Sequence, residues 1–394
     1  MGAKLTLPLL AARVTGNHLR EKVRPVRVTR ADETPPNVRA ITPQWLTAVL
    51  CAGVPGAAVE RFEVVGGSDG TSSRRALRVE YNSAGVAAKL PERLFTKSAS
   101  TLGSRLFLVL GGVTETESIF YNQVRPGLDG LRSPRAFHAA SDGRRFRSIV
   151  LMEDLAAVGW TFPDPMKERL SRRDVEDMID QMAYFHASFW DSPRLRADLA
   201  KLPTTEQFQA RLNDLGIERR ARVGIERVRD LTPPAVYRRK AELVPAVMRS
   251  LRLNSTGTPT LLHQDVHQGN WLRDPEGRMG LYDWQCVARG EWALDLSYAL
   301  SVNLPTEERR AWEQDLLDRY LWRLGEEGVP KPPTKDEALL RYRQQQFHIV
   351  MFTLLTIGAG RLQPAGMQPM DYMHRAWQRV AAFLDDHDCL DSLR

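Results

Sequence analysis

Three polar side chains in the second half of the chain have the chemistry that phosphoryl transfer requires. Asp265 is followed by Asn270 and then, after a short turn-forming segment, by Asp283. Phosphoryl transfer needs a carboxylate beside the attacking hydroxyl and divalent metal on the phosphates. We expect Asp265 to supply that carboxylate, and Asn270 and Asp283 to supply the oxygen ligands that Mg²⁺ prefers.

Two histidines alternate with the candidate carboxylate. On a strand, His263, Asp265 and His267 would share one face and could bind a metal as a triad. Gly269 favours a loop instead, so we expect His263 and His267 to support this loop through hydrogen bonds. Asp283 could be an ordinary turn residue, but its position directly after strand-like apolar residues favours a metal ligand.

The pattern His263-x-Asp265-x-His267-x-x-Asn270, followed by Asp283, resembles the catalytic loop of the aminoglycoside phosphotransferase and choline kinase-like family. The resemblance covers residues 42–390. It implies an α+β, two-lobed, protein-kinase-like fold, with an antiparallel sheet and one main helix in the N-lobe and a mainly helical C-lobe. It also implies that ATP, or GTP in its place, donates its γ-phosphoryl group to a hydroxyl of a small-molecule acceptor, assisted by Mg²⁺.

The same resemblance assigns roles to residues outside the loop. Lys89, on a strand expected over residues 86–90, resembles the kinase lysine that contacts the α- and β-phosphates, although it could be a surface lysine. Glu117 resembles the glutamate that pairs with this lysine, and Asp295 resembles an aspartate that braces the catalytic loop. Further nucleotide contacts are expected from a glycine-rich turn, which an ordinary hairpin would also use, and from the link between the lobes. These residues are Gly67, Ser68, Gly70, Ser72, Glu153 and Leu155.

Hydrophobic periodicity divides the chain into a strand-rich part and a helical part. Strands are expected over residues 59–65, 75–81, 86–90, 135–140 and 146–152, with a helix over 113–124 between the third and the fourth. Helices are expected over 42–50, 175–189, 205–230, 234–252, 306–325, 334–357 and 370–386, with His186 as a core histidine. We therefore predict a basic arm over 1–40, a nucleotide-binding lobe over 41–155, and a helical lobe over 156–394 that holds the catalytic loop and the acceptor pocket.

Charge and composition exclude several other classes. The net charge is +7, but residues 1–40 hold eight basic and three acidic residues, so the rest of the chain is nearly neutral. We interpret these residues as a solvated arm, with an anionic partner or a second subunit as the alternative, and expect no nucleic-acid binding. The three scattered cysteines indicate a reducing compartment, and no apolar run is long enough to span a membrane, so we expect a cytoplasmic protein.

The acceptor stays open at this stage. Aminoglycosides, amino alcohols, sugars and hydrophobic alcohols are all candidates, although short segments such as Gln44-Trp45-Leu46-Thr47 are most similar to the ecdysteroid-kinase-like branch. The C-terminal part lacks the acidic cluster that a polycationic acceptor would need. The Ala-Pro-Glu segment that would indicate a protein substrate is also missing after Asp283. A non-catalytic nucleotide-binding protein is the alternative function, and the oligomeric state is open.

Overall fold

The computed structural model describes residues 7–70, 72–214, 216–359 and 369–394. The described chain divides into two compact units. One, here called the sheet unit, lies within Met1–Gly127 and Pro134–Gly159. The other, here called the helical unit, lies within Leu128–Ser133, Trp160–Gln363 and Gln368–Arg394.

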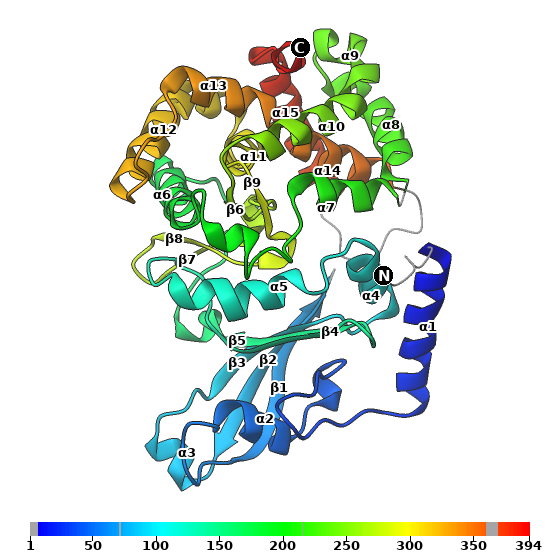
Figure 1. Cartoon of the computed structure of the whole chain (residues 1–394), viewed down its shortest axis with the longest axis vertical. Helices are drawn as coiled ribbons and strands as arrows, with labels where there is room; N and C mark the ends of the chain where they lie inside the picture. Colours follow the sequence, from blue (N-terminus) through cyan, green and yellow to red (C-terminus); the bar gives the residue numbers. More distant parts are fainter. Residues whose placement is uncertain (1–6, 71, 215, 360–368) are drawn as a thin grey trace. The chain divides into compact units, whose positions relative to one another are not determined.

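The sheet unit is built on a five-stranded antiparallel sheet with the strand order β1-β2-β3-β5-β4 (Figure 1). A buried cluster on the sheet includes Leu77 and Leu94 from the strands and Trp45 from α2. Helix α2 begins where expected, because Thr42 accepts a hydrogen bond from the Trp45 N–H and Pro43 occupies the first turn. The strands are β1 (Val59–Asp69), β2 (Ser73–Tyr81), β3 (Arg93–Ser98), β4 (Ala136–Asp142) and β5 (Arg147–Glu153), and α2 covers Pro43–Leu50.

The strand predicted over residues 86–90 is wrong. The segment instead forms a short helix, α3 (Ser83–Ala87), because the Asn82 side chain accepts a hydrogen bond from the Gly85 N–H and caps it. Lys89 follows in a left-handed backbone conformation with φ 54°, which no strand residue adopts. The third strand of the sheet is β3, a few residues further along the chain.

The helix predicted over 113–124 is found in part, as several short pieces. Helix α5 (Thr116–Ile119) continues into a wider π-type turn over Phe120–Val124 and a 3₁₀ turn over Arg125–Gly127. The sequence analysis missed α4 (Leu102–Leu110), which precedes them.

The described part of the arm packs on the other elements of the sheet unit, and residues 7–23 are helical. Helix α1 (Leu7–Val23) lies beside α4 (Figure 1). Near its end Glu21 forms ion pairs with Arg105 on α4 and with Arg147 on β5, at 2.6 and 2.7 Å, and all three side chains are largely buried. The picture of a solvated arm is therefore wrong for this segment, because a non-local ion-pair network holds it in place.

The helical unit contains helices and two short two-stranded sheets. Strand β6 (Thr260–Leu262) pairs with β9 (Ala288–Gly290), and β7 (Trp271–Arg273) pairs with β8 (Met279–Leu281). The helices are α6 (Arg172–Ser188), α7 (Thr205–Asn213), α8 (Ile217–Arg227), α9 (Pro234–Arg238), α10 (Lys240–Thr256), α11 (Ala293–Asn303), α12 (Thr306–Glu326), α13 (Lys335–Gln344), α14 (Phe347–Ile357) and α15 (Met370–Asp386). The predicted α+β fold class, with one antiparallel sheet unit and one mainly helical unit, is confirmed. Within the described ranges, none of the helices has the length and apolarity needed to cross a membrane.

Candidate active site

The catalytic loop joins β6 to β7 and is fixed by a carboxylate from α11. Asp295 is fully buried, and its two oxygens accept hydrogen bonds from the backbone N–H groups of His263 and Gln264, at 2.7 and 2.8 Å. His186 on α6 lies 3.3 Å from the same carboxylate and bonds Tyr320 through its other ring nitrogen. Burial lowers the pKa of His186, so its neutral ring donates to Asp295 and accepts from the Tyr320 hydroxyl.

His263 links the catalytic loop to the segment that follows β8. Its Nε2 donates to the carbonyl of Tyr282 at 2.9 Å, and its Nδ1 accepts from the backbone N–H of Asp265 at 3.2 Å. Burial lowers the pKa of His263, which agrees with a neutral ring that both donates and accepts. This histidine therefore supports the loop, and both of its nitrogens are used in doing so.

Asp265 is held in place at both oxygens and is still accessible. Oδ1 accepts from the hydroxyl of Tyr298 at 3.0 Å, and Oδ2 accepts from Nδ2 of Asn270 at 3.0 Å. Nε2 of His267 lies 3.7 Å from Oδ1, while its Nδ1 accepts from the Gly269 N–H. The Asp265 side chain nevertheless keeps 31% of its surface exposed. The arrangement offers a fixed carboxylate that can accept a further hydrogen bond.

Asn270 and Asp283 lie on adjacent parts of the backbone. The N–H of Tyr282, directly before Asp283, donates to the carbonyl of Asn270 at 3.0 Å, and the Tyr282 hydroxyl donates to the Gly269 carbonyl at 2.7 Å. Asp283 itself has a left-handed conformation with φ 66° and ψ 59° and directly precedes a 3₁₀ turn over Trp284–Cys286. Side chains of the two residues therefore start from neighbouring backbone positions.

This donor set has the chemistry of a magnesium site. Asn270 uses its NH₂ group on the Asp265 carbonyl and carboxylate, at 2.7 and 3.0 Å, which leaves the orientation of its amide oxygen fixed. Among the described residues, no group of three or more His, Cys, Asp or Glu side chains could hold a metal ion. Mg²⁺ typically takes one or two protein carboxylates together with substrate phosphates and water, so one amide and one carboxylate suit it.

In the sheet unit, a buried ion pair joins Lys97 on β3 to Glu117 on α5. Nζ lies 2.8 Å from Oε1, and the two side chains are only 7% and 11% exposed. Lys97 is the residue that the sequence analysis missed, because Lys89 was placed on a strand that does not exist. Arg93–Ser98 does not alternate apolar and polar side chains, so hydrophobic periodicity gave little signal for this strand or its lysine. Lys89 is exposed, and the expected pairing of Glu117 with it is wrong, because Glu117 pairs with Lys97.

The glycine-rich segment is part of a strand hairpin, and the expected loop over 66–70 is wrong in this respect. Gly67 and Ser68 belong to β1, and Gly70 donates from its backbone N–H to the carbonyl of Ser72. Gly67 has φ 152°, and a Cβ on it would lie 2.2 Å from the carbonyl oxygen of Arg74, so this position requires glycine. Ser72 is buried, and its hydroxyl has no hydrogen-bond partner in the described part of the chain.

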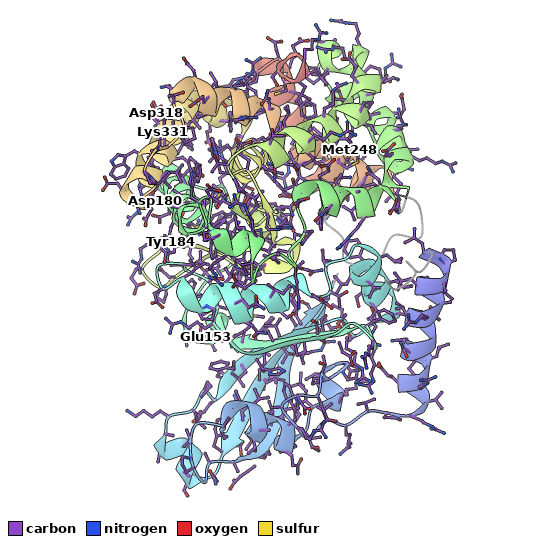
Figure 2. The ribbon with its side chains drawn as sticks, viewed as in Figure 1. Glu153, Asp180, Tyr184, Met248, Asp318 and Lys331 are labelled. Atoms are coloured by element: carbon purple, nitrogen blue, oxygen red, sulfur yellow. The ribbon has the colours of Figure 1, made fainter. Side chains whose placement is uncertain are left out.

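Glu153 and Leu155 lie where β5 ends. Glu153, labelled in Figure 2, exchanges hydrogen bonds with Arg135: its carboxylate accepts from the Arg135 N–H at 2.8 Å, and its own N–H donates to the Arg135 carbonyl. Leu155 starts a 3₁₀ turn over Leu155–Val158 and is buried. Their expected role with a nucleotide stays a prediction.

Tyr298 is the second functional candidate that the sequence analysis missed. It lies three residues after Asp295 on α11, so both side chains emerge from the same face of the helix. Burial is the main reason why the pKa of Tyr298 is raised well above its ordinary value, so its hydroxyl stays protonated and donates to Asp265. The i, i+3 spacing from the bracing aspartate was the available signal.

Comparison with known proteins identifies the class of this chain. The model of the phosphotransferase enzyme family matches residues 115–331, more than half of the 394 residues. Comparison with curated proteins gives no match.

Solved structures of low sequence identity also match. A choline/ethanolamine kinase family protein from Mesorhizobium loti is 16% identical, with 89% of this chain and 96% of that chain covered and a TM-score of 0.47. A choline kinase from Streptococcus pneumoniae is 15% identical, with 82% and 94% covered and a TM-score of 0.44. The GDP complex of aminoglycoside 2′-phosphotransferase-IIIa is 15% identical, with 88% and 99% covered and a TM-score of 0.42.

Proposed function

Because the chain belongs to the phosphotransferase enzyme family, we propose that it moves the γ-phosphoryl group of ATP to a hydroxyl of a small-molecule acceptor. The observation that carries this proposal is the Asp265 carboxylate, which Tyr298 and Asn270 hold at its two oxygens while it stays open to an acceptor. Such a carboxylate orients a hydroxyl and accepts its proton late in the transfer.

Each group in the proposed reaction has one task. The acceptor oxygen forms the new bond to the γ-phosphorus as the bond to the β-phosphate oxygen breaks, and ADP leaves with that electron pair. The acceptor proton passes to Asp265. Asn270 and Asp283 hold Mg²⁺, which offsets the negative charge of the phosphates when it is bound. Lys97 binds the phosphates of the nucleotide, and Glu117 keeps its ammonium group in position.

The surroundings of Asp265 favour a neutral or anionic acceptor over a polycation. The aromatic ring of Tyr372 on α15 lies 6.4 Å from that of His267, and Arg375 and Arg379 follow Tyr372 by three and seven residues on the same helix. Two guanidinium groups would repel an aminoglycoside, whose amines are positively charged. We therefore propose an alcohol without multiple amines.

The test is turnover by the full-length protein with Asp265→Asn as the decisive variant. ATP or GTP consumption is measured with Mg²⁺ against alcohols, sugars, amino alcohols and aminoglycosides, with Asp198→Asn as a control because Asp198 is an exposed partner of Arg194. We expect Asp265→Asn to lower kcat about 10²–10⁴-fold, as for other general-base substitutions, and the control to leave it unchanged.

Two results would contradict the proposal. Turnover by Asp265→Asn within tenfold of the parent would remove Asp265 from the reaction. Nucleotide binding by calorimetry without turnover of any acceptor class would instead favour the non-catalytic alternative.

A further inference from the structure

A cavity of about 460 Å³ lies inside the sheet unit, under the N-terminal arm. We call it the arm cavity; its lining comes from α1, the segment 25–40, β1, β2, β3 and the start of α4. Ser98 of β3 lines it, whereas Lys97 is the neighbouring residue on the same strand. Successive side chains of a strand point to opposite faces, so the arm cavity is on the other face of the sheet from the Lys97–Glu117 pair.

The lining of the arm cavity carries an excess of positive charge. Its cations are Lys22, Arg39, Arg75 and Arg105, and its carboxylates are Glu21 and Asp69. The carboxylates are already paired, because Asp69 bonds Arg75 at 2.9 Å and Glu21 bonds Arg105 at 2.6 Å. Within the described ranges, no carboxylate lies at ion-pair distance from Lys22 or Arg39, which are both exposed. The cavity therefore has positive charge to offer to an anion.

Two buried groups in the lining have unused nitrogen atoms. Arg105 is 1% exposed; its Nε donates to the Ala99 carbonyl and its Nη2 to Glu21, but its Nη1 has no hydrogen-bond partner in the described chain. His18 is 7% exposed, and its Nδ1 likewise has no partner there. Buried donors are almost always satisfied, since an unmade hydrogen bond costs about 1–3 kcal/mol. Both residues line the same cavity, which points to an acceptor that occupies it.

Helix α4 and nearby hydroxyl groups complete the lining. Thr101 caps α4, a helix of nine residues, and the positive end of its dipole lies at the cavity. Ser98 adds a hydroxyl group, which can donate to a ligand oxygen, whereas the Ser73 hydroxyl donates to Asp69 and also bonds that of Ser100. This combination of a guanidinium, a hydroxyl and a helix N-terminus is suited to a tetrahedral oxyanion.

We propose that the arm cavity binds a phosphate group, either as free phosphate or as the end of a small organic monoester. The ligand accepts hydrogen bonds from Arg105 Nη1 and His18 Nδ1 and pairs with Lys22 and Arg39. Because Lys22 and His18 belong to α1, bound phosphate also ties this helix to α4 and the sheet. The proposal does not depend on the proposed function.

The test is calorimetric binding of inorganic phosphate and of phenyl phosphate to the full-length protein, against chloride at equal ionic strength. The test variant is Lys22→Gln with Arg39→Gln, because both residues are exposed and their loss spares the buried Glu21 network. The matched control is Arg24→Gln with Arg27→Gln, two exposed arm cations that do not line the cavity. A further variant, Lys97→Met, shows whether phosphate binds at the arm cavity or at the proposed nucleotide site. A parallel measurement is amide exchange of residues 7–23 with and without phosphate.

We expect saturable phosphate binding that the test variant weakens at least fivefold and that the matched control and Lys97→Met leave unchanged. Amide exchange in α1 should slow when phosphate binds. Tighter binding of phenyl phosphate would identify a monoester as the ligand, and equal or weaker binding would identify free phosphate. No saturable binding over chloride, or binding that Lys97→Met removes and the test variant leaves intact, would overturn the proposal.

Discussion

The two units hold their candidate functional groups in different ways. In the sheet unit, Lys97 and Glu117 are paired with each other directly at 2.8 Å. In the helical unit, Asp265 bonds Asn270 and is also held by residues that have no proposed chemistry of their own: His263 and Tyr298 bond it directly, and Asp295 fixes the backbone of its loop. Because this ion pair of the sheet unit is buried, removing one partner leaves the other charge unpaired and costs stability as well as function. A group held by a separate scaffold depends on the folding of that scaffold.

The largest effect is expected where the scaffold of the helical unit is broken. The buried Asp295 carboxylate accepts hydrogen bonds from the His263 and Gln264 N–H groups. In Asp295→Asn, the NH₂ group of the new amide would face one of these N–H donors. We expect this substitution to cost about 3–5 kcal/mol of unfolding free energy and to abolish turnover. Urea denaturation measures the loss, with Asp198→Asn, an exposed ion-pair partner, as the control near zero. A loss below 1 kcal/mol would mean that α11 does not hold the loop.

A change in the ion pair of the sheet unit should also lower activity strongly. Lys97→Met removes the ammonium proposed to bind phosphates, and we expect kcat/KM for the nucleotide to fall about 100-fold, or roughly 2.7 kcal/mol. Lys89→Met is the matched control, since Lys89 is exposed, and should leave kinetics unchanged. Equal losses in both variants, by steady-state assay, would remove the assignment of Lys97.

A third prediction concerns pH and the start of α11. Burial raises the pKa of Glu291 from 4.5 to about 7, although Arg341 lies 3.3 Å away and opposes the shift. Folding therefore favours the protonated acid, so the stability that Glu291 contributes is full below its unfolded pKa near 4.5 and is lost as pH rises through 7.

Glu291→Gln mimics the protonated acid and should test this directly. At pH 8 we expect the variant to be more stable than the parent by about 2 kcal/mol, with the advantage shrinking toward pH 4.5. Urea denaturation at pH 5, 6.5 and 8 measures it. A parent that becomes more stable relative to the variant as pH rises would show that Arg341 outweighs burial.

The smallest effect tests how Asp265 is oriented. Tyr298→Phe removes the hydroxyl that donates to Oδ1 at 3.0 Å, and we expect kcat to fall about tenfold with a stability change near 1 kcal/mol. Tyr184→Phe is the control, because that hydroxyl, on α6 and labelled in Figure 2, accepts from the Gly130 N–H instead. A change in KM alone would mean that Tyr298 contacts the acceptor and does not position Asp265.

The parts of the molecule that the sequence predicted well are those held by short-range contacts. Asn270 bonds Asp265, and His263 bonds the Asp265 N–H. These residues are two and five positions apart, so their spacing in the sequence already indicates that they lie close together. The lysine of the sheet unit depends on strand pairing, where Lys97 faces Val150, far along the chain. A single local cap at Asn82 was enough to turn the expected strand into a helix.

The arm shows the same limit at a larger scale. The basic residues of 1–40 were counted correctly, but their interpretation depended on Glu21, an acidic residue that pairs with Arg105 and Arg147. These partners lie far from Glu21 in the chain and gave no periodic signal. Counting charges therefore identified the basic arm but could not predict that it packs on the sheet unit.

Asp283 has a left-handed backbone with φ 66°, so the residue that the proposed chemistry needs is not the one that this backbone conformation favours. Glycine adopts this conformation without steric cost, whereas another residue there typically stores about 1 kcal/mol or more. A glycine at this position would relieve the backbone and remove the carboxylate proposed for Mg²⁺. At this position a substitution that favours the backbone would therefore remove the proposed metal ligand.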